Sequence, residues 1–426
     1  MRITREQNER LTRVENGAPM GEVFRRYWIP ALLADEVPEP DAPPVRVRLL
    51  GEDLVAFRDS NGEVGLVDAY CSHRRAPLFF GRNEECGIRC VYHGWKFDVN
   101  GNCLDTPSEE PGARLRFRAG IKAYPVHEAG GIIWTCMGPV DSMPEPPDHE
   151  WLRAPETHRG VSKTNEACNF LQAIEGGIDT AHSSFAHNND LSNNRSLRAL
   201  DRHPELDVDL QPHGFTYSSR RRIGGGRVYL RVYQFAMPST QIRSVRLSWH
   251  GEGEEASYPA LHGHIWVPVD DHNTAIYNFA YSADPGQPMP ENWFEDHEHE
   301  MGRGPEDFKP GTFWLVREPA NDFMIDREIQ RTRTFTGIEG VNTQDFAIQT
   351  GMGRIVDRSQ EALGSTDLAI STARKLLLDM TDRVRRGEPM LGSAPEDHNG
   401  TRATDMLMAE DEPWREVSKD LTAAWY

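Results

Sequence analysis

The chain has 426 residues, which exceeds the usual size of one domain, and 38% of them are hydrophobic, enough for more than one core. Its 66 acidic side chains outnumber 47 basic ones, and the formal charge of −19 argues against nucleic acid or an anionic membrane surface as a partner. The sequence has no membrane-spanning apolar run and no signal-peptide core, and six cysteines do not make a disulfide scaffold. We therefore expect a cytoplasmic protein of two domains.

Residues 1–30 are expected to form an N-terminal helical segment that packs on the later, catalytic domain. Four prolines between residues 38 and 44 mark a linker, and residues 31–150 are predicted to form a β-domain that a second group of prolines closes. Runs of β-branched and aromatic residues indicate its strands, and two Asn-Gly pairs predict type I′ hairpins. The strands are expected at 45–49, 54–57 and 64–67, and the turns at Asn61-Gly62 and Asn100-Gly101.

Two Cys-plus-His pairs lie on loops of this β-domain: Cys71 with His73, and Cys90 with His93. Two thiolates and two imidazoles match the mixed ligand set of a Rieske 2Fe-2S cluster, in which the imidazoles raise the reduction potential. A structural zinc site and four unconnected buried residues are the alternatives. The loop setting and the aromatic stretch 94–97 after His93 favour the cluster.

The second domain, residues 151–390, opens with further candidate site residues. Asp179 and His182 are three positions apart, on one face if the stretch is helical, and His187 follows. Two histidines at such spacing are often ordinary core or surface residues. A cluster that moves only single electrons needs a second redox centre, however, and this need makes His182 and His187 candidate ligands of a ferrous iron with open positions for dioxygen.

The middle of this domain is predicted to be a β-sheet, with strands at 215–217, 228–233, 243–247, 264–267 and 275–279. Apolar residues that recur every three or four positions from Leu368 to Val384 predict a helix. Ser365 or Thr366 is expected to cap its start, and Gly387 to end it. Residues 391–426 are polar and are expected to form a C-terminal tail.

The chain resembles the oxygenase (alpha) component of Rieske non-haem iron aromatic-ring oxygenases, and among them the phthalate 4,5-dioxygenase-like group. The resemblance is carried by Arg-Arg-Tyr-Trp-Ile-Pro at 25–30 and Cys-Val-Tyr-His-Gly-Trp-Lys-Phe at 90–97, and it continues through most of the chain. It departs in the first loop, where Ser72 and Arg75 replace the proline and glycine that relatives commonly have. The implied fold is α+β, with a small all-β Rieske domain and a larger catalytic domain whose antiparallel sheet is flanked by helices.

The same resemblance points to Asp345 as the carboxylate that completes the mononuclear Fe(II) site; Asp357 and Asp367 are competitors. An ion pair explains Asp357 more simply, and a charge in the first turn of a helix explains Asp367. Asp179 is the candidate catalytic bridge between His182 and a cluster histidine, His93. In similar oxygenases this bridge crosses between subunits, which implies a head-to-tail trimer or stacked trimers.

No glycine-rich dinucleotide fingerprint opens a helix, so electrons are expected from a separate NADH-dependent reductase of the flavin and iron-sulfur type. The expected activity is that of a terminal oxygenase that uses O2 to hydroxylate, by cis-dihydroxylation, a phthalate-like or benzoate-like aromatic carboxylate. A monooxygenase that carries out O- or N-demethylation of an aryl substrate is the alternative. Two hypotheses outside the oxygenases are a Rieske electron carrier and a zinc-stabilised binding module.

Six further residues are candidates for contacts with the substrate or around the iron. Arginine pairs both oxygens of a carboxylate, so Arg243 or Arg246 is expected to bind the substrate. Ser183 lies beside a candidate ligand, and Asn169, Gln172 and Glu175 precede Asp179 by one to three helical turns.

Overall fold

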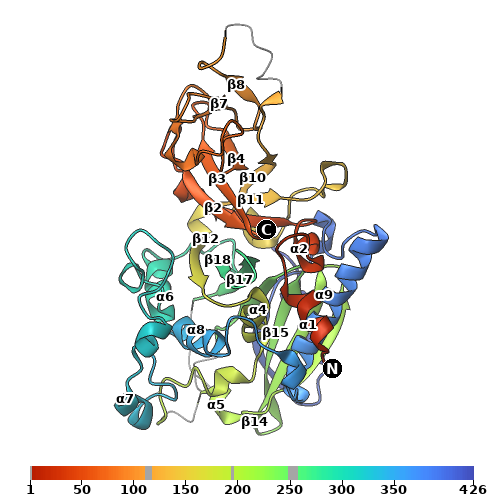
Figure 1. Ribbon diagram of the computed structural model, residues 1–426. Coiled ribbons are helices and arrows are strands. Elements are labelled where there is room, and N and C mark those ends of the chain that lie inside the picture. The colour runs from red at the N-terminus through yellow and green to blue at the C-terminus, as the bar shows by residue number, and fades with distance from the viewer. Residues whose placement is uncertain (1, 111–117, 193–195, 248–257) are drawn as a thin grey trace.

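The structure of the protein is a computed structural model that describes residues 2–110, 118–192, 196–247 and 258–426. Figure 1 shows a small β-domain stacked on a larger domain in which helices flank a sheet. The α+β fold expected from the sequence is confirmed. No helix among the described residues is long and apolar enough to cross a membrane.

The small domain contains three small antiparallel sheets. Their strands, in spatial order, are β2 (Val45–Leu49), β3 (Glu52–Arg58), β4 (Val64–Asp68) and β9 (Ala123–Tyr124); β5 (Arg82–Asn83), β6 (Ile88–Arg89), β7 (Lys96–Phe97) and β8 (Cys103–Asp105); and β1 (Trp28–Leu33), β11 (Ile132–Cys136) and β10 (Val126–Ala129). Buried Val55, Phe57 and Phe97 pack with the two cysteines of the paired motif, so the cluster loops rest on the core of this domain.

The two Asn-Gly turns differ from the predicted type I′ geometry, because only Gly62 and Gly101 have positive φ. Asp59 accepts hydrogen bonds from the backbone N–H groups two and four residues later, and Asp98 does the same in its own turn. These side-chain contacts favour a longer turn that ends on a left-handed glycine.

The large domain is built on one eight-stranded antiparallel sheet. Its strands, in spatial order, are β12 (Arg159–Glu166), β18 (Thr274–Ser282), β17 (Ala260–Pro268), β16 (Thr240–Ser244), β15 (Arg227–Ala236), β14 (Gly214–Gly224) and β13 (Glu205–Gln211), with β19 (Thr404–Ala409) paired to β15. Burial of every residue in β17 and β18 shows that both faces of the sheet are covered there.

Helices cover the sheet and carry the site. They are α1 (Arg5–Thr12), α2 (Pro19–Phe24), α3 (Glu150–Arg153), α4 (Phe170–Ile178), α5 (Leu197–Leu200), α6 (Trp293–Met301), α7 (Arg327–Thr332), α8 (Val341–Gly351), α9 (Leu368–Arg386) and α10 (Trp414–Val417). The N-terminal pair α1 and α2 lies against α9, and α4 packs on β17 and against α8.

Three local expectations are corrected by the structure. Helix α4 ends at Ile178 with Asp179 as its C-cap, so Asp179 and His182 lie in a turn and not on one helical face. Helix α9 ends at Gly387 as predicted, but neither Ser365 nor Thr366 caps its start, because they belong to a short 3-10 turn. The expected C-terminal tail is partly built into the sheet through β19.

The pairing of β19 with β15 has a physical reason in Asp405. Its fully buried carboxylate accepts hydrogen bonds from Tyr229, Ser244 and the backbone of Leu247. The charged Asp405 can therefore be buried, because its carboxylate is hydrogen-bonded.

Candidate active site and metal centres

The two Cys-plus-His loops have the same backbone geometry. In the first loop, the N–H of Cys71 donates to the carbonyl of Ala76, and the carbonyl of Cys71 accepts from the N–H of Arg75. In the second loop, the N–H of Cys90 donates to the carbonyl of Trp95, and the carbonyl of Cys90 accepts from the N–H of Gly94. All four distances are 2.8–2.9 Å. Arg75 and Gly94 occupy equivalent positions, and both have positive φ. Arg75 therefore takes a left-handed conformation, which glycine adopts without strain. This conformation explains why relatives commonly have glycine at the position of Arg75.

The four side chains of these loops gather at one place. The rings of His73 and His93 lie 4.5 Å apart, and the ring of Trp95 stacks on His73 at the same distance. Cys71 and Cys90 are buried, and burial together with the neighbouring Cys90 thiol raises the pKa of Cys71 to about 11. Nδ1 of His73 is buried without a hydrogen-bond partner among the described residues. Two thiols and an orphaned imidazole nitrogen fit a 2Fe-2S cluster, whose binding releases the thiol protons.

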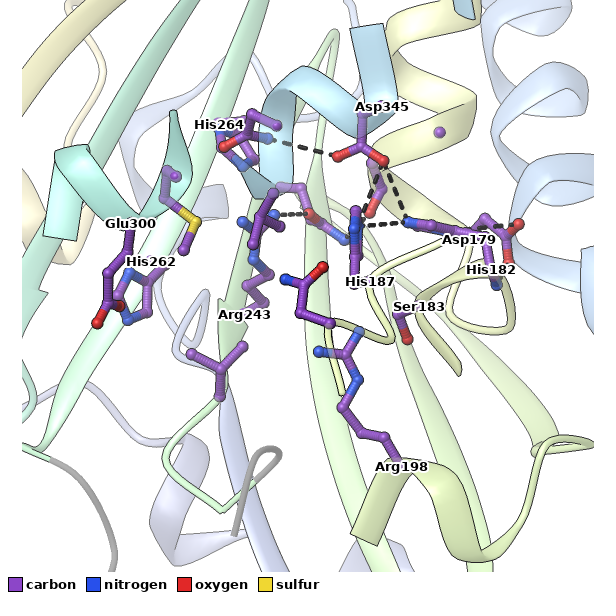
Figure 2. Close-up of a pocket in the computed structure, with 18 of the residues that line it drawn as sticks. Asp179, His182, Ser183, His187, Arg198, Arg243, His262, His264, Glu300 and Asp345 are labelled. Carbon is purple, nitrogen blue, oxygen red and sulfur yellow. Dashed lines mark hydrogen bonds and ion pairs between the residues drawn. The ribbon is translucent and has the colours of Figure 1, made fainter. Parts of the chain in front are cut away.

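A second set of ligands converges in the large domain. His182 lies in the turn after α4, His187 follows it, and Asp345 lies on α8. The Nε2 atoms of His182 and His187 are 3.0 Å apart. Oδ1 of Asp345 lies 3.4 Å from Nε2 of His182 and 3.3 Å from Nε2 of His187 (Figure 2). Metal bonds of about 2.1 Å span a triangle of this size. Two histidines and one carboxylate on one face leave open positions, as in non-haem ferrous sites.

Neighbouring groups fix the charge and orientation of these three side chains. Although burial opposes a charged imidazole, the carboxylates of Asp179 and Asp345 raise the pKa of His182 to about 10. Burial lowers the pKa of His187, whose Nδ1 lies 2.8 Å from Oε1 of Gln344. The two histidines hold the pKa of Asp345 well below its ordinary value despite its burial.

Asp179 lies beside this site but does not reach the other motif within the chain. One of its oxygens lies 3.6 Å from Nδ1 of His182, within ion-pair range but longer than a hydrogen bond. The other oxygen accepts from the N–H of Ala181 at 2.7 Å. The buried guanidinium of Arg221 donates to the carbonyl of Thr180 at 2.7 Å and holds this turn against the sheet.

Neither competing carboxylate approaches the histidines. Asp357 accepts hydrogen bonds from the backbone and hydroxyl of Ser359, and Asp367 accepts from the backbone of Gly364. The carboxylates of Asp357 and Asp367 therefore stabilise local turns. Among the three predicted carboxylates, only Asp345 shares a site with His182 and His187.

A cavity of about 790 Å³ opens beside the three ligands and extends toward α6. Strands β15, β16 and β17 form its floor, and α4 and α8 form one wall. Arg198, Arg231 and Arg243 line it, as do Ser183 and the predicted ligands (Figure 2). Its size exceeds that of a single benzene ring several times and is ordinary for a small-molecule site.

Four predicted candidates lie outside the cavity lining. Asn169 caps α4 and its amide donates to Thr12 and Asp271, while the amide of Gln172 donates to the carbonyls of Gln349 and Gly353. Glu175 is buried between Arg358 and Arg374, and Arg246 contacts Asp405. These side chains anchor α4 and the sheet, because each is used by a structural partner.

Five residues that line the cavity were not predicted as site residues: Arg198, Arg231, His262, His264 and His297. The signal for two of them was present, since His262, His264 and Trp266 alternate on one strand and so face the same side. Nothing in the local sequence distinguished Arg198 from the many surface arginines. The acidic residues around His297 give no sign of a site, but its ring stacks on Trp293 and lines the cavity.

Comparison with protein families matches the chain in two parts. The model of a Rieske (2Fe-2S) domain matches residues 27–125, and the model described as LigXa C-terminal domain like matches residues 135–424. These parts contain the two sets of candidate ligands, respectively.

Individual proteins are similar over nearly the whole chain. The phthalate 4,5-dioxygenase oxygenase subunit of Pseudomonas putida is 37% identical over 406 residues, covering 92% of this chain and 89% of that protein. The 5,5'-dehydrodivanillate O-demethylase oxygenase subunit of a Sphingobium species is 31% identical, covering 91% of this chain and 82% of that protein. The solved structure of a Pseudomonas putida CBB5 NdmA mutant with theobromine covers 93% of this chain and all of its own, with a TM-score of 0.61 at 17% identity, which supports the fold alone.

Proposed function

The chain belongs to the family of Rieske non-haem iron oxygenases, and on that premise we propose that it is a terminal oxygenase that uses O2 to hydroxylate an aromatic carboxylate. Enzymes of this family carry a 2Fe-2S cluster that transfers single electrons and a ferrous iron that binds dioxygen beside the substrate. The proposed cluster ligands are Cys71, His73, Cys90 and His93. The proposed iron ligands are His182, His187 and Asp345.

The cationic lining of the cavity carries the proposal of a carboxylate substrate. Arg231 donates to the carbonyl of Ser244 and Arg243 to the amide oxygen of Gln241, both neutral acceptors. Burial and the neighbouring Arg231 lower the pKa of Arg243 to about 10. Asp345 and Asp405 act on these two guanidiniums only through their charge, and among the described residues neither guanidinium makes an ion pair. Burying an unpaired charge is costly, so the site favours an anionic ligand.

The position of Arg243 suits the role of an anchor. It lies on β16, the middle strand of the cavity floor, and Figure 2 shows it between the ligand triad and His262. A carboxylate held there by the guanidinium fork orients the attached ring toward His182, His187 and Asp345. Ser183, whose hydroxyl donates to Thr180, offers a further oxygen to the substrate.

The reaction proposed for this substrate is cis-dihydroxylation of a phthalate-like or benzoate-like ring, which the similarity to a phthalate dioxygenase supports. The similarity to an O-demethylase favours demethylation of an aryl ether as the second candidate. Turnover under labelled dioxygen separates the two: a diol that contains both labelled atoms is expected, whereas release of formaldehyde would establish the second reaction.

Binding measurements test the carboxylate directly. Replacing Arg243→Met is expected to weaken binding of benzoate or phthalate by at least about tenfold, because a hydrogen bond to a charged group is lost. Arg246→Met is the matched control, since Arg246 contacts Asp405 and lies outside the cavity lining. Equal affinity of the Arg243→Met variant and the wild type, or binding of benzamide as tight as that of benzoate, would refute the proposal.

Two partners complete the proposed function. We infer that a separate NADH-dependent reductase of the flavin and iron-sulfur type supplies electrons, since the sequence has no dinucleotide fingerprint. The same chain is proposed to form a head-to-tail trimer, alone or stacked, in which Asp179 connects His182 with the His93 of a neighbouring subunit. Figure 1 supports this arrangement, because β7, which follows the loop of His93, lies at the end of the small domain far from α4 and α8.

Exposed apolar side chains support the same assembly. Phe80, Val91 and Tyr92 are more than half exposed around the cluster loops. Ile348 and Met352 are about half exposed on and just after α8. Two apolar patches on opposite parts of one chain suit a head-to-tail contact that closes into a ring.

A further inference from the structure

A row of polar side chains crosses the sheet beneath the cavity. Ser162 on β12 lies opposite Asn278 on β18, which lies opposite His264 on β17, so the three side chains share one face. The amide nitrogen of Asn278 lies 3.1 Å from the hydroxyl of Ser162. Its amide oxygen lies 2.8 Å from Nδ1 of His264.

The direction of every hydrogen bond in this row is determined by a buried ion pair. Arg303 donates to both oxygens of Glu298, and although burial opposes it, Arg303 lowers the pKa of this carboxyl. Because a carboxylate only accepts, the hydroxyl of Ser162 must use its single proton for Glu298, at 2.5 Å. Ser162 therefore accepts from the amide nitrogen of Asn278, and the oxygen of Asn278 accepts from Nδ1–H of His264.

This fixed proton leaves a lone pair on Nε2 of His264. The imidazole is buried, and burial followed by the charges of Arg243 and Arg303 lowers its pKa well below the ordinary value, with Asp345 opposing. Nδ1 makes the one hydrogen bond found for this ring among the described residues. The ring lines the cavity and is labelled between His262 and Asp345 in Figure 2. The cavity thus contains a neutral acceptor near a cationic anchor.

We propose that Nε2 of His264 selects aromatic carboxylates whose ring also carries a hydrogen-bond donor, such as a phenolic hydroxyl or an amine. The inference rests on the proposed function, since Arg243 on the adjacent strand binds the carboxylate. A substituent that offers only lone pairs, such as a methoxy group, would leave two acceptors facing each other in a buried site. Sites built to bond a hydroxyl reject the analogue that lacks it for this reason.

Calorimetry on the holoenzyme without oxygen tests the inference, with benzoate and its hydroxy, amino and methoxy derivatives at each ring position as probes. At one ring position, the hydroxy and amino derivatives are expected to bind about tenfold more tightly than the methoxy derivative. The variant His264→Leu is expected to reduce this ratio to about one. His264→Gln keeps an acceptor oxygen, so this variant is expected to retain part of the preference for the hydroxy and amino derivatives over the methoxy derivative.

The variant His262→Leu is the matched control, because His262 lies on the same face two residues away and contacts Trp293 and His297 instead. Its ratio is expected to stay near that of the wild type. A methoxy derivative that binds as tightly as the hydroxy derivative, or a ratio unchanged in His264→Leu, would overturn the inference. If His264→Leu fails to fold, the ligand series on the wild type and on His264→Gln decides.

The outcomes also separate this inference from the proposed function. Benzoate that binds without any preference for a hydroxyl or amine rejects only the role of His264. Benzamide that binds as tightly as benzoate rejects the carboxylate site, and with it the function on which the inference depends.

Discussion

The orientation of His187 is determined by one amide. Nε2 of Gln344 donates to Oδ1 of Asn189 at 2.7 Å and to the carbonyl of Ile338 at 2.9 Å, so this amide cannot be reversed. Its Oε1 therefore accepts the Nδ1 proton of His187, at 2.8 Å. The other ring nitrogen keeps its lone pair and points to Asp345. Partners of this kind orient a metal-binding imidazole and increase its basicity.

Replacing Gln344→Leu should therefore weaken the mononuclear iron site without disturbing the cluster. We expect about tenfold lower affinity for ferrous iron, because the imidazole is free to rotate and to change tautomer. Iron retention after dialysis against a chelator measures the effect, and the visible absorption of the cluster serves as an internal reference. Gln330→Leu, on the exposed helix α7, is the control. Equal iron retention in both variants would contradict the role of Gln344.

Single residues differ in how well the sequence predicts their place. The proximity of the candidate ligands Cys71, His73, Cys90 and His93 could be predicted from their spacing, because a short loop brings each Cys-plus-His pair together whatever the rest of the fold. The choice of Asp345 needed a family resemblance, since its approach to His187 depends on how α8 packs across the domain. Arg198 could not be found at all, because no local pattern distinguishes a buried guanidinium from an exposed one.

Helix α4 positions the turn that carries Asp179 and the candidate ligand His182, and its glycine Gly177 packs directly against the sheet. A Cβ built on Gly177 would overlap the buried ring of Trp266 on β17. The carbonyl of Gly177 also accepts from the amide of Gln241 at 2.8 Å. The helix therefore lies closer to the sheet than a side chain would allow, and Asp179 and His182 follow immediately after it.

The substitution Gly177→Ala should destabilise the large domain by about 1–3 kcal/mol, because the rigid indole and the helix must move apart. The same displacement should lower iron retention, since it shifts the turn that carries His182. Thermal unfolding and chelator dialysis measure the two effects. Gly351→Ala, at the end of α8, is the control, because a Cβ there meets open space. A Gly177→Ala protein as stable as this control would show that the contact relaxes freely.

Elements were predictable where their periodicity is local. The strands β2, β15 and β18 were expected from runs of β-branched and aromatic residues, and α9 from its apolar repeat. Strand β19 was missed because the surrounding C-terminal segment is polar, although the strand itself includes apolar Met406, Leu407 and Met408, and its pairing depends on a distant strand and on hydrogen bonds to Asp405. Strand pairing between residues about 175 positions apart leaves no mark in a short window of sequence.

At the scale of the whole molecule, three buried histidines join the start of the large domain to its C-terminal segment. The rings of His149 and His398 stack at 4.0 Å, and Nε2 of His213 lies 3.1 Å from Oε1 of Gln234. Burial lowers the pKa of all three, that of His213 to about 4, and repulsion from His398 adds to the effect for His149 and His213. The folded protein therefore keeps them neutral at a pH where the unfolded chain takes up protons.

This difference predicts a loss of stability in acid. Between the unfolded pKa of about 6.5 and the folded value, the unfolded state binds more protons, so stability falls as the pH drops and is constant above that range. His213→Gln keeps a donor to Gln234 but cannot titrate, and should reduce the loss between pH 7.5 and 5 by about 2 kcal/mol. Unfolding midpoints at both pH values measure it, with exposed His203→Gln as the control. Identical pH dependence in both variants would contradict the argument.

The positions of the two candidate metal centres raise the question of whether electrons pass between them within one chain or between neighbouring chains. The candidate cluster ligands lie in the small domain, whereas Asp345 lies on α8 and His182 and His187 lie in the segment after α4. Figure 1 shows α4 and α8 far from β7, which follows the loop of His93. Among the described residues, no hydrogen bond or ion pair joins His73 or His93 to Asp179. The proposed ring of subunits would overcome this separation, because the His93 loop of one chain would then be available to the Asp179 of the next.

Co-expression of two inactive variants tests transfer between subunits. His93→Ala removes a proposed cluster ligand and Asp345→Ala removes a proposed iron ligand, so neither variant alone should form product. In a mixed head-to-tail trimer, one junction places an intact cluster beside an intact iron site, and statistical mixing should restore about a quarter of wild-type product. Chemically reduced protein exposed once to O2 with a bound aromatic carboxylate gives this yield without a reductase. Mixed trimers as inactive as the two parents would mean that each chain supplies its own iron, and Asp179 would then have no bridging role between subunits.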